Sequence, residues 1–188
     1  LPRIGALATG TMAGSFFAPP SIEVWYGDEQ HFGRVGVPQK WINILGRVRP
    51  GDGLAAVTYS LNGGAPVKLS TGAYGYRLAR PGDYNIDLEF DALREGANEL
   101  KLVALDETGR RAERVVRVIC QRGRTWPLPY SVDWTATRSI TDAVQIVDGN
   151  WRLEAGGVRT VETYYDRILA LGDRTWTDYT LTAEVTFH

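Results

Sequence analysis

Residues that commonly carry catalysis or bind metals are scarce in this chain. Its 188 residues include one cysteine, Cys120, and two histidines, His31 and His188. A single cysteine excludes an internal disulfide, and a structural zinc site usually needs about four cysteine, histidine or carboxylate ligands at suitable spacing. The Gly-x-Ser-x-Gly and Gly-x-Gly-x-x-Gly patterns and the phosphate-binding loop are also missing. We therefore expect a non-catalytic protein with no metal and no cofactor.

The chain also lacks an excess of charge of either sign. Lysine and arginine total 21, aspartate and glutamate total 22, and the formal net charge is -1. This balance gives no electrostatic reason to expect nucleic acid or an anionic membrane as a partner. No apolar run approaches the ~20 residues that a membrane-spanning helix needs, so we expect no membrane-spanning segment.

No signal peptide with a basic and an apolar part is recognisable, although the chain begins with Leu1 and not with methionine. We therefore expect Leu1 to lie inside a longer precursor or at the start of a processed product. Residues 1–20 carry a single charged residue, Arg3, and end in two prolines. This composition predicts an extended leader or linker.

Glycine, proline and aromatic residues are plentiful, with 21 Gly, 9 Pro, 6 Trp, 9 Tyr and 5 Phe. They fit turn-rich β structure better than helical packing. Between residues 21 and 121, alternating apolar and polar residues predict strands, and residues 30–38 are predicted to be a loop. The expected strands are 22–26, 40–48, 54–61, 65–69, 84–90, 98–105 and 111–119. About seven short strands in about 100 residues indicate an immunoglobulin-like β-sandwich.

The last part of this region supports the same fold through a resemblance. Residues 93–118 contain Gly96 and Asn98 at a corner, and Asp106 and Gly109 in a hairpin turn, each followed by an alternating strand. This run resembles the last two strands of bacterial immunoglobulin-like and fibronectin-like repeats. The resemblance implies a fold and says almost nothing about a ligand.

A second region follows a proline-rich stretch. Residues 122–130 contain Pro127 and Pro129, which favour extended backbone, so we predict a stiff linker and place the domain boundary near Gly123. From residue 131 the strand pattern restarts, with expected strands at 132–134, 144–147, 151–153, 158–161 and 164–171. The final residues alternate again, with Leu181, Ala183 and Val185 apolar. A strand with one apolar face needs neighbours, and none follows in the sequence, so we expect the domain of residues 131–188 to be truncated.

This second region also resembles a known class. Residues 147–153, with the pattern Asp-Gly-x-Trp, and residues 165–185 resemble the opening strands of concanavalin A-like, laminin-G-like jelly-roll modules. The expected fold is therefore all-β, an immunoglobulin-like β-sandwich (residues 21–121) followed by an incomplete jelly-roll β-sandwich segment. Two sandwiches in tandem resemble exported bacterial proteins that bind at or outside the cell surface, so the expected location is periplasmic, cell-surface or extracellular.

The second region holds the candidate ligand-binding residues. Aromatic rings can stack on the apolar faces of sugars, while charged groups fix the hydroxyls. These aromatics can equally be core residues, since a sandwich needs large side chains between its sheets, and a strand allows at most one of two adjacent tyrosines to point inward. The charged pair can equally form a structural ion pair. The six candidates are Trp151, Tyr164, Tyr165, Asp166, Arg167 and Trp176.

The first region offers weaker alternatives. Asp28 and Glu29 lie in a loop and could hold calcium through oxygen ligands, but they lack the alternating acidic spacing of a calcium loop. The simpler interpretation is a loop packed by Phe32 and Trp41. Cys120 ends a predicted core strand, where cysteines are usually inert. A catalytic pair of Cys120 with a histidine is therefore not expected.

Three functions remain open from the sequence. The leading expectation is an exported structural, assembly or accessory subunit that acts through contacts with other protein chains. The first alternative is a carbohydrate- or cell-surface-binding module with a glycan as partner. The second is the non-catalytic part of a secreted glycoside hydrolase whose carboxylate pair follows residue 188, because no closely spaced pair is recognisable here.

Overall fold

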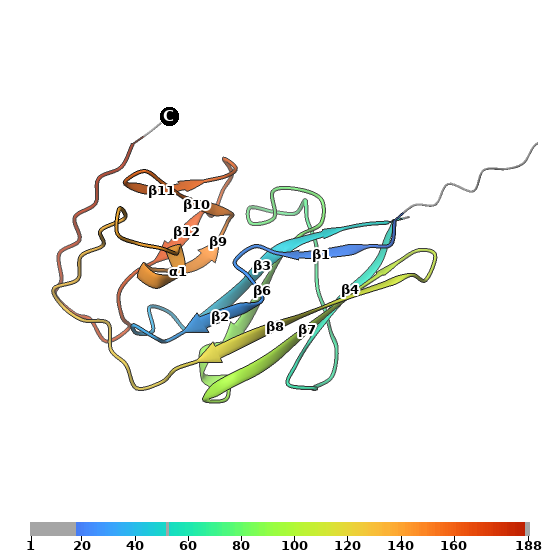
Figure 1. Cartoon of the computed structure of the whole chain (residues 1–188), viewed down its shortest axis with the longest axis horizontal. Helices are drawn as coiled ribbons and strands as arrows, with labels where there is room; N and C mark the ends of the chain where they lie inside the picture. Colours follow the sequence, from blue (N-terminus) through green and yellow to red (C-terminus); the bar gives the residue numbers. More distant parts are fainter. Residues whose placement is uncertain (1–17, 52, 187–188) are drawn as a thin grey trace, which may run out of the picture.

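The structure, a computed structural model, describes residues 18–51 and 53–186, and strands make up nearly all of its regular elements (Figure 1). Eight strands form two sheets. The three-stranded sheet has the order β1-β3-β6, formed by Ser21–Val24, Trp41–Arg49 and Asp83–Glu89. The five-stranded sheet has the order β2-β8-β7-β4-β5, formed by Glu29–Phe32, Arg111–Cys120, Gly96–Asp106, Leu54–Leu61 and Val67–Lys68. The all-β class predicted from the sequence is confirmed.

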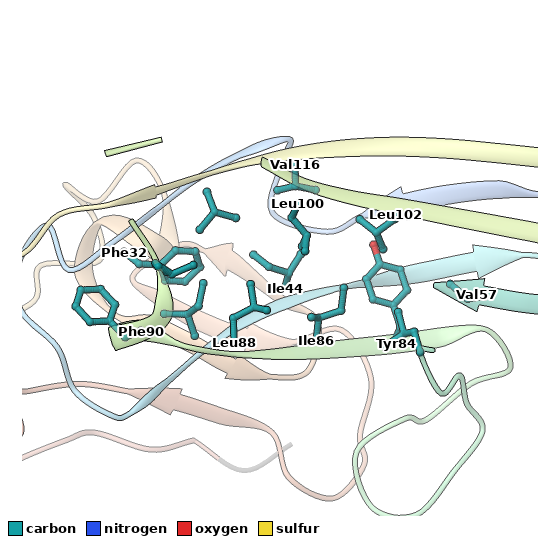
Figure 2. Packing of buried hydrophobic residues seen from close by; sticks show 14 of the residues in the cluster. Phe32, Ile44, Val57, Tyr84, Ile86, Leu88, Phe90, Leu100, Leu102 and Val116 are labelled. Carbon is teal, nitrogen blue, oxygen red and sulfur yellow. The ribbon is translucent and has the colours of Figure 1, made fainter. Parts of the chain in front are cut away.

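The two sheets pack face to face over one apolar core. Along β7 the side chains of Leu100, Leu102 and Ala104 are buried while their neighbours are more exposed, as the two-residue period of a strand requires. On the opposite sheet Tyr84 and Ile86 of β6 are buried in the same way. Figure 2 shows Leu100 and Leu102 facing Tyr84 and Ile86 between the sheets. Burying each leucine or isoleucine side chain among them stabilises the fold by about 1.5–3 kcal/mol.

A glycine lets the buried tyrosine approach the backbone. The Tyr84 hydroxyl donates a hydrogen bond to the carbonyl oxygen of Glu23 at 2.9 Å, next to Gly46 of β3. A Cβ atom at Gly46 would lie 2.0 Å from that carbonyl oxygen and 2.4 Å from the Tyr84 hydroxyl oxygen. Gly46 is therefore needed where β1, β3 and β6 pack most closely.

One strand was not expected from the sequence. Residues 29–32, at the start of the predicted loop, form β2, which pairs in parallel with β8. The strand is short, and its residues Glu29, Gln30 and His31 are all polar, so no apolar run marks it. It forms because the edge of β8 supplies backbone partners, and because Gln30 and Phe32 turn inward on alternate positions.

The second region covers the outer face of the three-stranded sheet. It contains α1 (Ile140–Ala143) and the strand pair β9 (Gln145–Asp148) and β12 (Ile168–Ala170), together with the pair β10 (Trp151–Glu154) and β11 (Gly157–Thr160). Figure 1 shows these elements gathered beside β3. Leu45 of β3 points outward from the main core into a second apolar cluster. That cluster also contains Ile140, Ala143, Val144 and Ile146.

Several predicted segments of the second region differ from the structure. Residues 132–134 are not a strand, because Asp133 accepts hydrogen bonds from Thr135 and starts a turn. The predicted strand 164–171 shortens to β12. Residues 177–186 form no strand, and Leu181 and Val185 are 69% and 66% exposed. A strand is defined by backbone pairing, and within the described chain residues 177–186 pair with no other strand.

Two further segments complete the chain. The predicted linker 122–130 has no regular secondary structure, but Trp126 within it is buried. A short 3-10 helix, Phe90–Ala92, follows β6. Most of the predicted leader, residues 1–17, lies outside the described residues. Among the residues that the structure describes, no helix has both the length and the apolar character to cross a bilayer.

The hairpin between β7 and β8 depends on a buried carboxylate. Asp106 accepts hydrogen bonds from the backbone N–H groups of Thr108 at 3.0 Å and Arg110 at 2.8 Å, and from the Arg110 guanidinium at 2.8 Å. Burial alone would raise the pKa of Asp106, but the hydrogen bonds from Thr108 and Arg110 lower it from 3.8 to about 2. The hairpin turn is therefore stabilised by the ionised form of this side chain.

This geometry predicts an acid-dependent contribution to stability. Because the pKa of Asp106 is lower in the folded state, its contribution is present above pH 3.8 and is lost as the pH falls towards about 2. We expect Asp106→Asn to lower the free energy of unfolding at neutral pH and to reduce its fall over this acidic range. Urea unfolding at several pH values measures both effects, with the exposed Asp91→Asn as control. A variant with the pH dependence of the wild type would contradict the prediction.

Candidate functional site

The segment between β5 and β6 forms a narrow hairpin that projects two tyrosines. The backbone N–H of Tyr74 donates to the carbonyl of Leu78 at 3.0 Å, and the reverse bond is 3.3 Å long. Gly75 has a φ of +57, which favours glycine at the turn. Tyr74 and Tyr76 are 71% and 64% exposed. Neither ring therefore contributes to the core.

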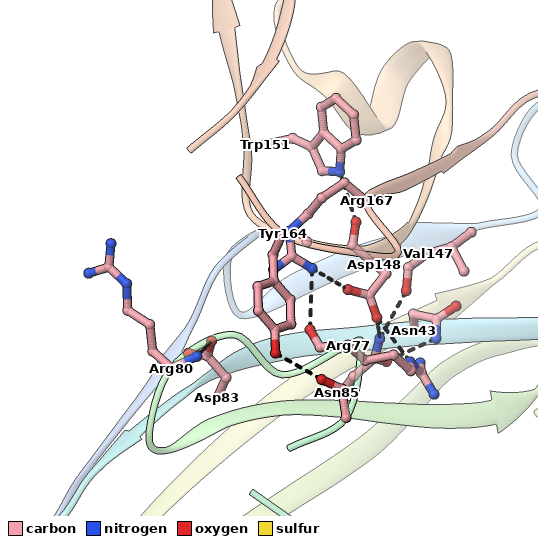
Figure 3. Close-up of polar contacts among 12 residues, drawn as sticks. Asn43, Arg77, Arg80, Asp83, Asn85, Val147, Asp148, Trp151, Tyr164 and Arg167 are labelled. Carbon is pink, nitrogen blue, oxygen red and sulfur yellow. Dashed lines mark hydrogen bonds and ion pairs between the residues drawn. The ribbon is translucent and has the colours of Figure 1, made fainter. Parts of the chain in front are cut away.

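A buried carboxylate lies beneath this hairpin. Asp148 of β9 accepts hydrogen bonds from Arg77 Nε, Asn85 Nδ2 and Arg167 Nη1, each at 2.9 Å (Figure 3). Burial raises the pKa of the Asp148 carboxyl above its usual value, although the hydrogen bonds from Arg77 and Asn85 act in the opposite direction. The three donors come from the hairpin, from β6 and from the segment before β12. Asp148 therefore joins the two regions of the chain.

Arg77 also makes a second, more exposed ion pair. Its Nη1 and Nη2 atoms contact the two carboxylate oxygens of Asp87, each at 3.0 Å, and Asn43 Nδ2 donates to Asp87 Oδ1 at 2.7 Å. The hydrogen bond to Asp87 raises the pKa of Arg77. Paired hydrogen bonds of this kind fix the orientation of a guanidinium group. Arg77 is thus held between one buried and one exposed carboxylate.

Two more contacts fix the hairpin from the second region. The Tyr164 hydroxyl donates to the carbonyl oxygen of Gly75 at 2.8 Å, and Arg167 Nη1 donates to the carbonyl oxygen of Arg77 at 3.2 Å. Arg167 fits because Gly149, with a φ of +87, has no side chain; a Cβ there would lie 2.3 Å from Arg167 Cδ. The hairpin is therefore held in place by hydrogen bonds to two of its carbonyl groups.

Two hollows meet at the Arg77–Asp87 ion pair. The larger, of about 580 Å³, contains Tyr59, Tyr74, Tyr76 and Lys68 in its lining, and we name it the tyrosine hollow. The smaller, of about 380 Å³, contains Gln39, Trp41, Asn43 and Ile168, and we name it the tryptophan hollow. Both volumes fall in the ~300–1,000 Å³ range of small-ligand sites. The residues common to both hollows are Arg77, Asp87 and Asp166. Together the two hollows form the Arg77–Asp87 groove.

Five of the six candidate residues from the sequence lie at or beneath this groove. Tyr165 is 66% exposed and packs edge to face against Tyr76, with ring centroids 5.0 Å apart. Asp166 is exposed and lines both hollows. Tyr164 and Arg167 support the hairpin from below. Asp166 and Arg167 were considered as one structural ion pair, but Arg167 pairs with Asp148.

Trp151 has a supporting position as well. Its indole Nε1 donates to the carbonyl oxygen of Asp148 at 2.8 Å, and its backbone N–H donates to the Tyr26 hydroxyl at 2.9 Å. The Tyr26 hydroxyl donates in turn to the carbonyl oxygen of Gly149 at 2.7 Å. Trp151 therefore holds the turn after β9 against the first region, where it orients Asp148.

Trp176, the sixth candidate, lies elsewhere. Its Nε1 donates to the carbonyl oxygen of Trp126 at 3.0 Å. The neighbouring Asp173 accepts hydrogen bonds from the backbone N–H groups of Val37 at 3.0 Å and Trp126 at 3.2 Å. These contacts join residues 172–176 to the predicted linker, and Trp176 takes no part in the groove.

Sequence reasoning did not select Tyr74, Tyr76, Arg77 or Asp87. The run Thr71-Gly-Ala-Tyr-Gly-Tyr76 could have indicated the two tyrosines, because aromatic residues between glycines in a loop have little core to enter. Asp87 carries no such signal, since it looks like any polar residue on the solvent side of a strand. Its role depends on Arg77, which the fold alone brings beside it.

The weaker candidates of the first region, Asp28, Glu29 and Cys120, have other surroundings. Asp28 pairs with Arg114, and Glu29 pairs with Arg117 and His31. Cys120 is buried at the end of β8, where burial raises the pKa of its thiol. Over residues 18–51 and 53–186, no group of three or more histidine, cysteine or acidic side chains is placed to hold a metal ion.

No protein-family model matches the chain, and no curated protein matches its sequence.

The central role of Asp148 can be tested by removing its charge. Asp148→Asn leaves Arg167 buried without a charged partner, so we expect a loss of about 3–5 kcal/mol in the free energy of unfolding. Asp87→Asn removes the exposed partner of Arg77 and should cost at most about 1 kcal/mol. Urea unfolding of both variants makes the comparison. Equal losses, or a negligible loss for Asp148→Asn, would show that Asp148 does not join the two regions.

Proposed function

We propose that this protein is a non-catalytic, exported module that binds carbohydrate in the Arg77–Asp87 groove. The observation that carries the proposal is the exposure of Tyr74 and Tyr76 in the lining of the tyrosine hollow, on a hairpin fixed by hydrogen bonds. The exposed Tyr165 packs against Tyr76 from the second region. Large aromatic side chains of a sandwich are usually needed in its core. A group of them exposed beside polar side chains favours a ligand with both apolar and hydroxyl-bearing faces.

The composition of the groove suits a sugar. Aromatic rings offer flat apolar surfaces to the C–H faces of a pyranose, and charged or amide groups bind its hydroxyls. The exposed rings include Trp41 in one hollow and Tyr76 in the other. Between them lie Arg77, Asp87 and Asp166, which supply both donors and acceptors of hydrogen bonds.

Binding without turnover is the activity we propose, because two of the three carboxylates that line the groove, Asp87 and Asp148, are already engaged in ion pairs. Hydrolysis of a glycosidic bond needs one carboxyl group that donates a proton and another that attacks or activates water. Asp87 is held by two hydrogen bonds from Arg77 and one from Asn43. Both oxygens of Asp148 accept hydrogen bonds as well. These contacts orient Arg77 and support the hairpin.

We also propose that residues 21–121 form an immunoglobulin-like domain. In that fold, the second and third strands lie in different sheets, and the last hairpin joins the sheet of the third strand. The order β1-β3-β6 against β2-β8-β7-β4-β5 supports this assignment, since β3 and β4 lie in different sheets and the β7–β8 hairpin pairs with β4. The jelly-roll resemblance of residues 131–188 stays a prediction.

The proposed function predicts which side chains matter for binding. Tyr76→Ala and Tyr165→Ala should each weaken polysaccharide binding about tenfold, the effect of losing about 1.4 kcal/mol of aromatic contact. Affinity gel electrophoresis with mixed-linkage β-glucan, xylan and galactomannan provides the measurement. Tyr179→Ala, which removes an exposed tyrosine outside the groove, is the matched control. If none of these polysaccharides retards the wild-type protein, or if Tyr76→Ala is retarded equally, the proposal is wrong.

Assembly through protein contacts is the second candidate function. It is favoured by residues 177–186, an irregular segment whose apolar side chains Tyr179, Leu181 and Val185 are well exposed. In the part of the chain that the structure describes, residues 177–186 make no backbone hydrogen bond to another segment. An alternating apolar segment with unpaired backbone groups can add to the sheet edge of another chain.

This second candidate predicts association that depends on the apolar side chains. The wild-type protein should form oligomers as its concentration rises, and the double variant Leu181→Asp with Val185→Asp should remain monomeric. Val115→Asp, at an exposed valine of β8, is the control for added charge. Size-exclusion chromatography with light scattering measures the mass. A wild-type protein that stays monomeric at every concentration would rule out self-association through this segment.

A further inference from the structure

We infer that the ligand is a neutral oligosaccharide, or a segment of a neutral polysaccharide, that crosses the Arg77–Asp87 ion pair and occupies both hollows. The inference rests on the proposed carbohydrate binding and adds the length and charge of the ligand. It follows from how the two hollows are joined, from the hydrogen-bonding groups between them and from the charges around them.

The hollows adjoin in a way that a chain-like ligand can use. Arg77, Asp87 and Asp166 line both, so the ion pair lies between the two spaces. Exposed aromatic rings lie on each side, with Trp41 in the tryptophan hollow and Tyr76 in the tyrosine hollow. A single sugar unit in one hollow leaves the aromatic surface of the other unused, whereas a chain contacts both.

The ion pair between the hollows can bind hydroxyls without breaking. The side chains of Arg77 and Asp87 are 40% and 41% exposed. The hydrogen bonds to Asp87 and Asp148 use only some of the N–H donors of the Arg77 guanidinium group. The Asp87 carboxylate can likewise accept more hydrogen bonds than it receives from Arg77 and Asn43. A sugar above the pair can therefore hydrogen-bond to both charged groups.

The charges around the groove balance, which favours an uncharged ligand. The charged side chains that line the two hollows are Lys68, Arg77, Asp87, Asp148 and Asp166. Arg167, outside the lining, pairs with Asp148 and brings the set to three positive and three negative groups. Arg77 and Arg167 are neutralised by direct pairing with the carboxylates of Asp87 and Asp148. A polyanion or a polycation therefore meets no net charge of opposite sign here.

The backbone that carries the aromatic rings is fixed before a ligand binds. Tyr76 belongs to the hairpin whose carbonyl groups accept hydrogen bonds from Tyr164 and Arg167. Trp41 is anchored in β3, and its carbonyl oxygen accepts a hydrogen bond from Gln145 Nε2 at 2.7 Å. Because little ordering is left for binding, contacts on both sides add to affinity with a small entropic loss.

The test is a chain-length series measured by isothermal titration calorimetry. The probes are cello-, xylo- and manno-oligosaccharides from the disaccharide to the hexasaccharide. For the series that binds, the hexasaccharide should bind at least about tenfold more tightly than the disaccharide, which corresponds to about 1.4 kcal/mol. Trp41→Ala should remove most of this gain with chain length, because it takes away the aromatic surface of the tryptophan hollow. Tyr76→Ala should weaken both ligands, and Tyr179→Ala neither.

Each other outcome has a defined meaning. Equal affinity for disaccharide and hexasaccharide would overturn the inference and leave the proposed carbohydrate binding intact. Tighter binding of polygalacturonate or chitosan than of the neutral probes would overturn the neutral charge of the ligand. If neither the neutral probes nor polygalacturonate and chitosan bind, the proposed function fails and the inference fails with it. Gln39→Ala, in the same hollow as Trp41, gives a second test should Trp41→Ala fold poorly.

Discussion

The arrangement of the groove depends on one buried carboxylate, Asp148. Placing its charge in the interior is unfavourable unless several donors compensate it at once. Those donors are Arg77, Asn85 and Arg167, which come from three separate parts of the chain. All three must be in position for the site to be satisfied. The second region, the exposed hairpin and the outer face of the three-stranded sheet are consequently coupled, and none can shift without unpairing a buried charge.

The sequence could predict those strands whose own residues carry the pattern. The alternation of Leu100, Leu102 and Ala104 on β7 is visible in the sequence because one face of that strand meets the core. The short strand β2 has no recognisable pattern in the sequence, because it forms by pairing with the edge of β8 and not through its own composition. Residues 177–186 show the opposite error: Leu181 and Val185 alternate as in a strand, but the described chain offers them no partner.

The site was predictable to the extent that its residues are adjacent in the chain. Residues 164–167 were selected as a group, and the structure places all four around the groove. The remaining members come from the segment between β5 and β6 and from β6 itself, so only folding brings Arg77 and Asp87 to them. Trp176 was selected for its aromatic character alone, and such a side chain serves equally well beside Trp126 in a structural contact.

Because Gly149 has no side chain, this position influences how the surface around the groove can change during evolution. Arg167 passes through the space that a Cβ would fill, and from there it holds the hairpin that carries Tyr76. A substitution at position 149 would displace Arg167 and so alter the spacing of rings that Gly149 never touches. Selection for a different target can thus act through a remote backbone position, with every recognition residue left unchanged.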